Sequence, residues 1–332
     1  MDNQRADFRR QGEDLVFNLV WTGTVFDHLR YFAASQMAHS SARFRFVANA
    51  CPPDQIAAME AFAAEHPGRV VEVLEVSTDR MVRHGDALDV VLQTRDDGPF
   101  FAFVDPDIIA QGPYLDRFVE LLEDVAAVTS GKEVWSDHNV RPAEHPGVNG
   151  EYFYDQDGYV FGSPHFAIYR RGPLLDTLER WGVGFSSGGN DISEAARAQL
   201  AACGRDYWIF DTAKIVNVLL QGDGHELVHY EEPALLHIGS LSLYISPPST
   251  APAARGKPGW GEDWGEQDEN ATRYMVARYT AEVLAAVCEG RPAPELPSEV
   301  DAGVAPRLAL VRTALIELLA AYREPVADEE AP

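Results

Sequence analysis

The chain of 332 residues is 46% hydrophobic, which is enough to bury the core of one elaborated α/β domain or of two smaller domains. It carries 27 Lys and Arg residues against 52 Asp and Glu residues, and this net charge of −25 argues against a nucleic acid or an anionic membrane as the main partner. The three cysteines lie far apart and form no C-x-x-C pair, which argues against structural zinc and favours a cytoplasmic location.

The first third of the chain alternates predicted strands with predicted helices. A polar segment at 1–14 has no apolar signal core, and no apolar run approaches the roughly 18 residues that a membrane span needs. The predicted strands cover 15–20, 44–48, 70–76 and 100–104, and the predicted helices cover 25–38, 55–65 and 84–93. This alternation with short connections predicts a mostly parallel sheet flanked by helices on both faces.

The rest of the chain has a less regular pattern. Further helices are predicted at 115–124, 174–181, 192–203, 212–220, 271–288 and 306–322, and further strands at 126–129, 160–169 and 226–230. The segments 135–158 and 182–189 have the composition of loops, 234–239 that of a turn-bound segment, and 324–332 that of a disordered tail. The stretch 246–270 contains Pro, Gly, acidic residues and two tryptophans, and we expect a flexible loop or a lid there.

The last predicted helix carries an apolar stripe formed by Leu308, Val311, Leu315, Leu318, Leu319 and Tyr322. We expect this stripe to dock onto the chain's own domain, and a homodimer contact is the alternative.

Two carboxylates, Asp105 and Asp107, stand directly after the uninterrupted apolar run 100–104. Such a run predicts a strand buried on both faces, and Pro106 predicts that the strand ends at Val104 or Asp105. Ligands bind at the carboxyl ends of parallel strands, and paired carboxylate oxygens suit Mg²⁺ or Mn²⁺ together with substrate phosphates. Asp-Pro is also a common way to start a turn, so a solvated turn is the alternative interpretation.

Three segments resemble motifs of the nucleotide-sugar glycosyltransferases of the GT-A fold, and most of all the family 2-like bacterial members. FVDPD at 103–107 resembles the Asp-x-Asp motif, RHGDALD at 83–89 resembles the nucleotide-contacting segment, and LHIGS at 236–240 resembles the late histidine motif. The resemblance covers roughly residues 15–245 and implies a Rossmann-like GT-A catalytic domain. Its nucleotide-binding half would span 15–109 and its acceptor half 110–245, with C-terminal helices at 271–323 outside it.

The resemblance also implies roles for individual residues. Those expected to contact the nucleotide sugar are Val20, Thr22, Gly23, Arg83, Gly85, Asp89 and Asp105. Asp105, Asp107 and His237 would hold the Mn²⁺ or Mg²⁺ ion, and His237 would favour Mn²⁺ because imidazole is the softer donor. The usual Glu-Asp pair of the catalytic base is absent, so Asp191 is the first candidate base and Asp211 the second. Asp191 with Glu194 also has the spacing of a capping box ahead of the helix at 192–203.

The function that this resemblance implies is metal-dependent transfer of a sugar from a nucleoside-diphosphate sugar to a hydroxyl-bearing small molecule or glycan, with inversion at the sugar carbon. A haloacid-dehalogenase-like phosphatase also uses Asp-x-Asp after a strand, but usually near the N-terminus. A sugar nucleotidyltransferase shares the fold but normally opens with a Gly-rich basic loop, which WTGT at 21–24 is not. A nucleotide-sugar-binding protein without turnover is the non-enzymatic alternative.

Overall fold

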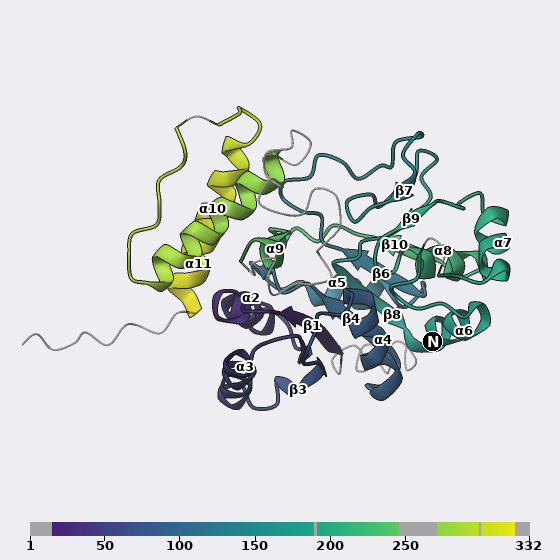
Figure 1. Ribbon diagram of the computed structural model, residues 1–332, viewed down its shortest axis with the longest axis horizontal. Coiled ribbons are helices and arrows are strands. Elements are labelled where there is room, and N and C mark those ends of the chain that lie inside the picture. Colours follow the sequence, from purple (N-terminus) through teal and green to yellow (C-terminus); the bar gives the residue numbers. More distant parts are fainter. Residues whose placement is uncertain (1–14, 189–190, 246–270, 299, 323–332) are drawn as a thin grey trace, which may run out of the picture.

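The computed structural model describes residues 15–188, 191–245, 271–298 and 300–322 (Figure 1). The predicted polar segment at 1–14, the predicted lid at 246–270 and the predicted tail at 324–332 lie outside these residues. Among the described helices, none is both long and apolar enough to cross a lipid bilayer.

A seven-stranded, mostly parallel sheet forms the centre of the fold, in the order β10-β6-β8-β4-β1-β2-β3. Its strands are β1 (Val16–Thr22), β2 (Arg43–Asn49), β3 (Val70–Ser77), β4 (Phe100–Val104), β6 (Ala127–Ser130), β8 (Phe166–Arg170) and β10 (Leu227–His229). Within this sheet only β8 runs antiparallel to its neighbours, β4 and β6. The predicted α/β class with a mostly parallel sheet is therefore confirmed.

Helices cover both faces of this sheet and enclose two hydrophobic cores. Those on the first face are α2 (Phe26–Ala38), α3 (Pro53–Glu65), α5 (Leu115–Leu121), α10 (Ala271–Cys288) and α11 (Ala305–Tyr322). Those on the second face are α4 (His84–Thr94), α6 (Arg171–Trp181), α7 (Glu194–Ala202) and α8 (Lys214–Gly222). Successive strand residues alternate between the faces, so in β4 Phe101 and Phe103 join the second core while Val104 joins the first.

The strand that precedes the two carboxylates forms as predicted. All five residues of β4 are buried, and the strand ends at Val104, because Pro106 has no N–H to continue a ladder. The chain then turns through Asp105 and Asp107 into β5 (Ile108–Ala110), which the sequence did not predict. This strand pairs antiparallel with β11 (Leu235–His237), so the predicted turn-bound segment at 234–239 contains a short strand instead.

The predicted strand at 160–169 is too long at its N-terminal end, since β8 begins at Phe166. The carbonyls that precede β8 accept hydrogen bonds from α8 side chains rather than from a neighbouring strand. Asn217 donates to the Phe161 carbonyl and Gln221 to the Val160 carbonyl, each at 2.7 Å. Pro164 also lacks a donor in this stretch, so the ladder cannot begin earlier.

The helix expected at 192–203 begins at Glu194, with Ser193 as its N-cap. The Ser193 hydroxyl accepts a hydrogen bond from the Ala196 N–H at 3.1 Å. The capping-box interpretation of Asp191 is therefore wrong, because serine supplies the acceptor oxygen at the correct position.

The C-terminal helices α10 and α11 pack against each other and against α2 (Figure 1). The stripe residues Leu308, Val311, Leu315, Leu318 and Leu319 are buried inside the chain, and Tyr322 is partly buried against the same core. The predicted docking of the last helix onto its own domain is therefore confirmed, and this stripe is not left exposed for a homodimer contact. β7 (Gly147–Val148), β9 (Ile209–Phe210) and α9 (Leu241–Ile245) complete the described elements.

Candidate metal and donor site

The antiparallel strand β8 brings a histidine to the edge of the sheet where β4 ends. Asp105 follows the last residue of β4, and His165 precedes the first residue of β8. The Asp105 N–H donates to the His165 carbonyl at 2.7 Å, so the two residues face each other across the pair of strands. Because the strands run in opposite directions, the start of β8 and the end of β4 meet at one edge.

A second histidine reaches the same place through the small sheet of β5 and β11. His237 is the last residue of β11 and pairs with Ile108 of β5. Its Nδ1 lies 2.7 Å from the Gly131 carbonyl oxygen, and its Nε2 lies 3.2 Å from Asp107 Oδ1. With Nδ1 facing the carbonyl, Nε2 is the nitrogen that a metal ion would take, and the ion would replace any proton held there beside Asp107.

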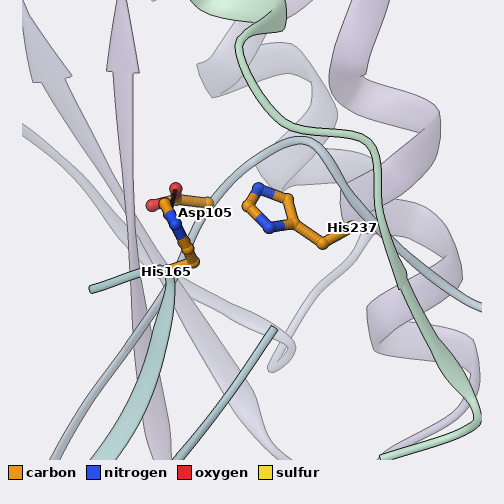
Figure 2. A group of neighbouring side chains, drawn as sticks. All are labelled: Asp105, His165 and His237. Atoms are coloured by element: carbon orange, nitrogen blue, oxygen red, sulfur yellow. Dashed lines mark hydrogen bonds and ion pairs between the residues drawn. The ribbon is translucent and has the colours of Figure 1, made fainter. Parts of the chain in front are cut away.

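Asp105, His165 and His237 form a group that could hold a metal ion. One ligand atom from each of the three side chains lies within 4.8 Å of the corresponding atoms of the other two. Figure 2 shows the Asp105 carboxylate beside the His165 ring, with the His237 ring next to them on a separate segment of the chain. Two imidazoles and one carboxylate form a donor set that favours Mn²⁺ or another first-row transition ion over Mg²⁺, which prefers oxygen.

Glu133 orients His165 from the side opposite Asp105. The His165 Nδ1 lies 2.9 Å from Asp105 Oδ2, and its Nε2 lies 2.8 Å from Glu133 Oε1. Burial disfavours the charged ring, but the charge of Glu133 and the hydrogen bond to Asp105 outweigh it and raise the pKa of His165 to about 10. Burial likewise opposes the charge of Glu133, yet the charge of His165 lowers the pKa of Glu133 to about 2.

Glu133 therefore holds an ionised carboxylate in the protein interior, where it is 4% exposed. Its second oxygen, Oε2, is buried and has no hydrogen-bond partner in the described part of the chain. Proteins usually orient a metal-binding imidazole by pairing a carboxylate with the ring nitrogen that faces away from the metal ion. The pair of Glu133 and His165 fits that pattern and supports a cation at Nδ1.

Asp107 is not part of the group of three and is held inside the fold. It is 3% exposed, and its Oδ2 accepts a hydrogen bond from the Leu241 N–H at 3.2 Å. Burial raises the pKa of Asp107, but the charge and hydrogen bond of His237 outweigh this effect and lower it. The structure thus places Asp107 beside His237 Nε2, the same nitrogen that would face a cation.

The N-terminus of α4 lies beside Asp105 and carries the predicted nucleotide-contacting segment. His84 Nε2 lies 3.8 Å from Asp105 Oδ1. Arg83 is exposed and forms an ion pair with Asp86 at 2.9 Å, and one of its nitrogens lies 3.5 Å from Asp191 Oδ2. Burial lowers the pKa of His84, so this imidazole is neutral at pH 7.

Gly85 and Asp89 hold α4 against the loop that follows α6. A methyl group at Gly85 would lie 2.5 Å from backbone atoms of Phe185 and Ser186, so only glycine fits there. The Asp89 carboxylate accepts the Phe185 N–H at 3.0 Å. These contacts give both residues a packing role between α4 and the 183–188 segment.

The three residues predicted at the end of the first strand differ in exposure. Val20 is 5% exposed and packs in the second core. Thr22 ends β1 and is partly exposed, and Gly23 follows it with a φ of +52°. Of the three, Thr22 therefore presents a polar side chain at the carboxyl edge of the sheet.

The two candidate bases occupy different surroundings. Asp191 is exposed and lies beside Arg83. Asp211 is also exposed and follows β9. A methyl group at Gly150 would lie 3.1 Å from Asp211 Oδ2 and 3.5 Å from His165 Nε2, so these two side chains border the same small space. Asp211 therefore borders the candidate metal group, whereas the contact seen for Asp191 is with Arg83.

Sequence reasoning missed His165 and Glu133, and neither stands in a recognisable motif. His165 precedes a strand whose antiparallel direction is visible only in the sheet order. Glu133 lies in the 131–136 segment, where its only secondary structure is an isolated bridge with His237. The long-range pairing that aligns Glu133 with His237 carries no local sequence signal.

The Asp89 carboxyl predicts a change of stability with pH. Burial raises the pKa of Asp89 to about 6 from its ordinary 3.8, so the folded state keeps a proton that the unfolded state has lost. Stability therefore falls as pH rises from 3.8 to 6, and the cost stays above pH 6. Between pH 4.5 and 7.5 the free energy of unfolding should fall by about 2 kcal/mol more for the wild type than for Asp89→Asn. Urea unfolding of both proteins at pH 4.5 and at pH 7.5 measures this difference. An equal change in the free energy of unfolding for the wild type and for Asp89→Asn would contradict the prediction.

The similarity of this chain to known proteins lies in three-dimensional structure rather than in sequence. No protein-family model matches the chain, and no curated protein has a similar sequence. The mannosyltransferase of Pyrobaculum calidifontis, solved with GDP-mannose and Mn²⁺, is 15% identical, with coverage of 92% of this chain and 74% of that one and a TM-score of 0.36. TarS of S. aureus is 11% identical, with 91% coverage of both chains and a TM-score of 0.41.

A third similar structure belongs to another class of enzyme. The 4-diphosphocytidyl-2C-methyl-D-erythritol synthase of Anaerococcus prevotii is 9% identical, with coverage of 70% of this chain and 96% of that one and a TM-score of 0.37. All three TM-scores lie below 0.5, so the function proposed below rests on the geometry of the site.

Proposed function

We propose that this protein is a metal-dependent glycosyltransferase that moves a sugar from a nucleoside-diphosphate sugar to a hydroxyl-bearing small molecule or glycan, with inversion at the sugar carbon. The observation that carries the proposal is the convergence of Asp105, His165 and His237 at the carboxyl edge of a mostly parallel sheet. This edge is where α/β folds bind nucleotides. We include a cytoplasmic location in the proposal, because the three cysteines lie far apart in the sequence and form no C-x-x-C pair.

The residues present fit a divalent cation. His165 and His237 each have a partner for the nitrogen that faces away from the group, Glu133 and the Gly131 carbonyl respectively. Asp105, His165 and His237 would hold Mn²⁺, with Mg²⁺ as the second choice, and Asp107 would lie beside the His237 nitrogen that faces the cation. When bound, the cation would neutralise negative charge on the leaving nucleoside diphosphate.

The donor would lie between the end of β1 and the N-terminus of α4. Thr22 and Gly23 would face the base or ribose, and Arg83 would offset phosphate charge at the rim. Val20, Gly85 and Asp89 would act through packing, because they shape the walls against which the nucleotide lies. Arg83 is half-exposed, so its contribution to binding would be smaller and would weaken with salt.

Asp211 would accept the proton from the acceptor hydroxyl. It is exposed, so an acceptor can reach it, and its Oδ2 borders the same space as His165. The new bond forms between the acceptor oxygen and the sugar carbon, the bond from that carbon to the diphosphate oxygen breaks, and the hydroxyl proton moves to the carboxylate. Asp191 is the alternative base, and its Oδ2 lies 3.5 Å from an Arg83 nitrogen.

The first test of this function is binding of nucleotide with metal. The full chain is heated with UDP, GDP or dTDP, each with and without Mn²⁺, and the experiment is repeated on Asp105→Asn. A ligand at about 100 times its Kd stabilises the fold by about 2.7 kcal/mol, so we expect Tm to rise by several degrees with one nucleotide plus Mn²⁺. The asparagine variant should lose this rise because its amide is a poor ligand for the cation.

Other results would favour other functions. No shift with any nucleotide would contradict the proposal and would direct attention to phosphatase chemistry. A shift without consumption of the matching sugar nucleotide, in the presence of a mixed panel of sugar and small-molecule acceptors, would identify a binding protein. Mn²⁺-dependent release of the nucleoside diphosphate that also requires an acceptor from the panel would confirm a transferase.

A further inference from the structure

The C-terminal helix α10 brings an arginine against both segments that carry the candidate metal group. The Arg273 Nε donates to the Ser240 hydroxyl at 2.6 Å, and its guanidinium carbon lies 5.0 Å from the centre of the Trp135 ring. Ser240 stands three residues after His237, and Trp135 stands two residues after Glu133. Arg273 is therefore tied to the site although it lies outside the 15–245 region.

The carboxylates whose charges act on Arg273 include Glu133, Asp107 and Asp211 of the candidate site, together with Glu151. Burial lowers the pKa of the Arg273 guanidinium. These carboxylates act in the opposite direction but do not cancel this effect. An arginine remains cationic at pH 7 even after such a shift. The partly buried guanidinium thus lies within the electrostatic influence of several carboxylates, which would otherwise repel a phosphate.

The segment next to this arginine is closely packed. A methyl group at Gly239 would lie 2.7 Å from the Trp135 Nε1 and 2.9 Å from Glu133 Cγ, so the backbone at 239 lies against both side chains. Gly239 and Ser240 both have positive φ angles, +79° and +67°, and Ser240 is strained there because it is not glycine. This conformation places the Ser240 hydroxyl where Arg273 donates to it.

The helix pair that carries Arg273 is fixed to the same place by a second arginine. Arg307 of α11 donates to the Trp135 carbonyl and to Asp137. α10 packs against α9 and α11, and α11 packs against α2 (Figure 1). The C-terminal helices therefore hold Arg273 in a fixed position relative to Glu133 and His237.

We propose that Arg273 binds the diphosphate of the donor, so that the C-terminal helix pair completes the donor site. This inference rests on the proposed glycosyltransferase function. A planar guanidinium presents paired N–H donors that match phosphate oxygens, and the surrounding carboxylates make an added cation necessary for an anionic ligand. The competing role is structural, in which Arg273 only neutralises Glu133 and its neighbours.

The test compares nucleoside diphosphate with nucleoside monophosphate in two variants of the full chain. Arg273→Met removes the guanidinium at the site, whereas Arg307→Met removes the arginine that holds the other side of Trp135. Binding of UDP, GDP or dTDP with Mn²⁺, using the nucleotide that stabilises the wild type, is measured by calorimetry beside the matching monophosphate. We expect Arg273→Met to weaken diphosphate binding about 10- to 100-fold and monophosphate binding much less, as expected for loss of a charge-assisted hydrogen bond.

Mn²⁺ binding without nucleotide separates the two roles of Arg273. Loss of a cation beside ligand carboxylates should leave Mn²⁺ affinity unchanged or higher, so weaker diphosphate binding then identifies a direct contact. Unchanged diphosphate binding in Arg273→Met, or equal losses in Arg273→Met and Arg307→Met, would overturn the inference. If Arg273→Met does not fold, Arg273→Lys carries the test, because it keeps the charge and loses the paired donors.

The two proposals fail in different ways. If the wild type binds no nucleoside diphosphate with Mn²⁺, the proposed function fails and takes this inference with it. If the wild type binds one and Arg273→Met binds it equally well, only the role of Arg273 is wrong.

Discussion

Replacing His165 by alanine should weaken Mn²⁺ binding by more than about 100-fold and abolish metal-dependent nucleotide binding. The change removes one of the three candidate ligands and leaves the buried Glu133 without its histidine partner. Loss of an outer-shell partner alone typically costs 10- to 100-fold in metal affinity, so loss of a ligand should cost more. The measurement is the electron paramagnetic resonance signal of free Mn²⁺ during titration of the protein.

His229→Ala is the matched control for this experiment. His229 is also a buried histidine, and it bonds Thr129 at 2.9 Å and Glu231 at 2.5 Å, away from the group of three. The control should therefore lose stability while it keeps the Mn²⁺ affinity of the wild type. Tight Mn²⁺ binding by His165→Ala would show that the cation, if any, binds elsewhere.

Replacing Asp211 by asparagine should lower kcat for sugar transfer by about 10²- to 10⁴-fold, with little change in KM for the donor. This is the usual contribution of a general base, and the amide cannot accept the proton. The Asp211 Oδ1 accepts the Thr212 N–H at 2.7 Å, and the asparagine oxygen can keep this bond, so the local backbone should stay in place. Initial rates with the nucleotide sugar identified by the binding screen measure the effect.

Asp191→Asn is the matched control and tests the rival assignment. Asp191 is an exposed carboxylate like Asp211, but its neighbour is Arg83 rather than the candidate metal group. We expect this variant to keep kcat within a few-fold of the wild type. If Asp191→Asn loses activity and Asp211→Asn does not, the base is Asp191 and the proximity of Asp211 to His165 has no role in the reaction.

Residues 100–107 show which structural features of this protein the local sequence pattern predicts and which it does not. The apolar run and the proline after it fixed the buried strand and its end at Val104, because both depend on the residues themselves. The same segment could not reveal which of its two carboxylates turns inward. Asp107 enters the fold because β5 continues the chain and pairs with β11, and that pairing joins residues far apart in sequence.

The two histidines of the candidate metal group also differ in whether the sequence predicted them. His237 was found because LHIGS at 236–240 resembles a motif, yet the contact of its Nδ1 with the Gly131 carbonyl could not be foreseen. His165 was missed because its place depends on β8 running antiparallel between β4 and β6. A reversed strand brings its first residue, rather than its last, to the edge where the parallel strands end.

The sequence by itself determined the α/β class, the mostly parallel sheet and the docking stripe of the last helix, because periodicity and composition act over a few residues. It also indicated the edge of the sheet where the site lies. Only the tertiary structure decided that His165 and Glu133 join Asp105 and His237, and that α10 places Arg273 beside them. These residues meet through strand order and helix packing, which depend on contacts across the whole chain and leave no local pattern.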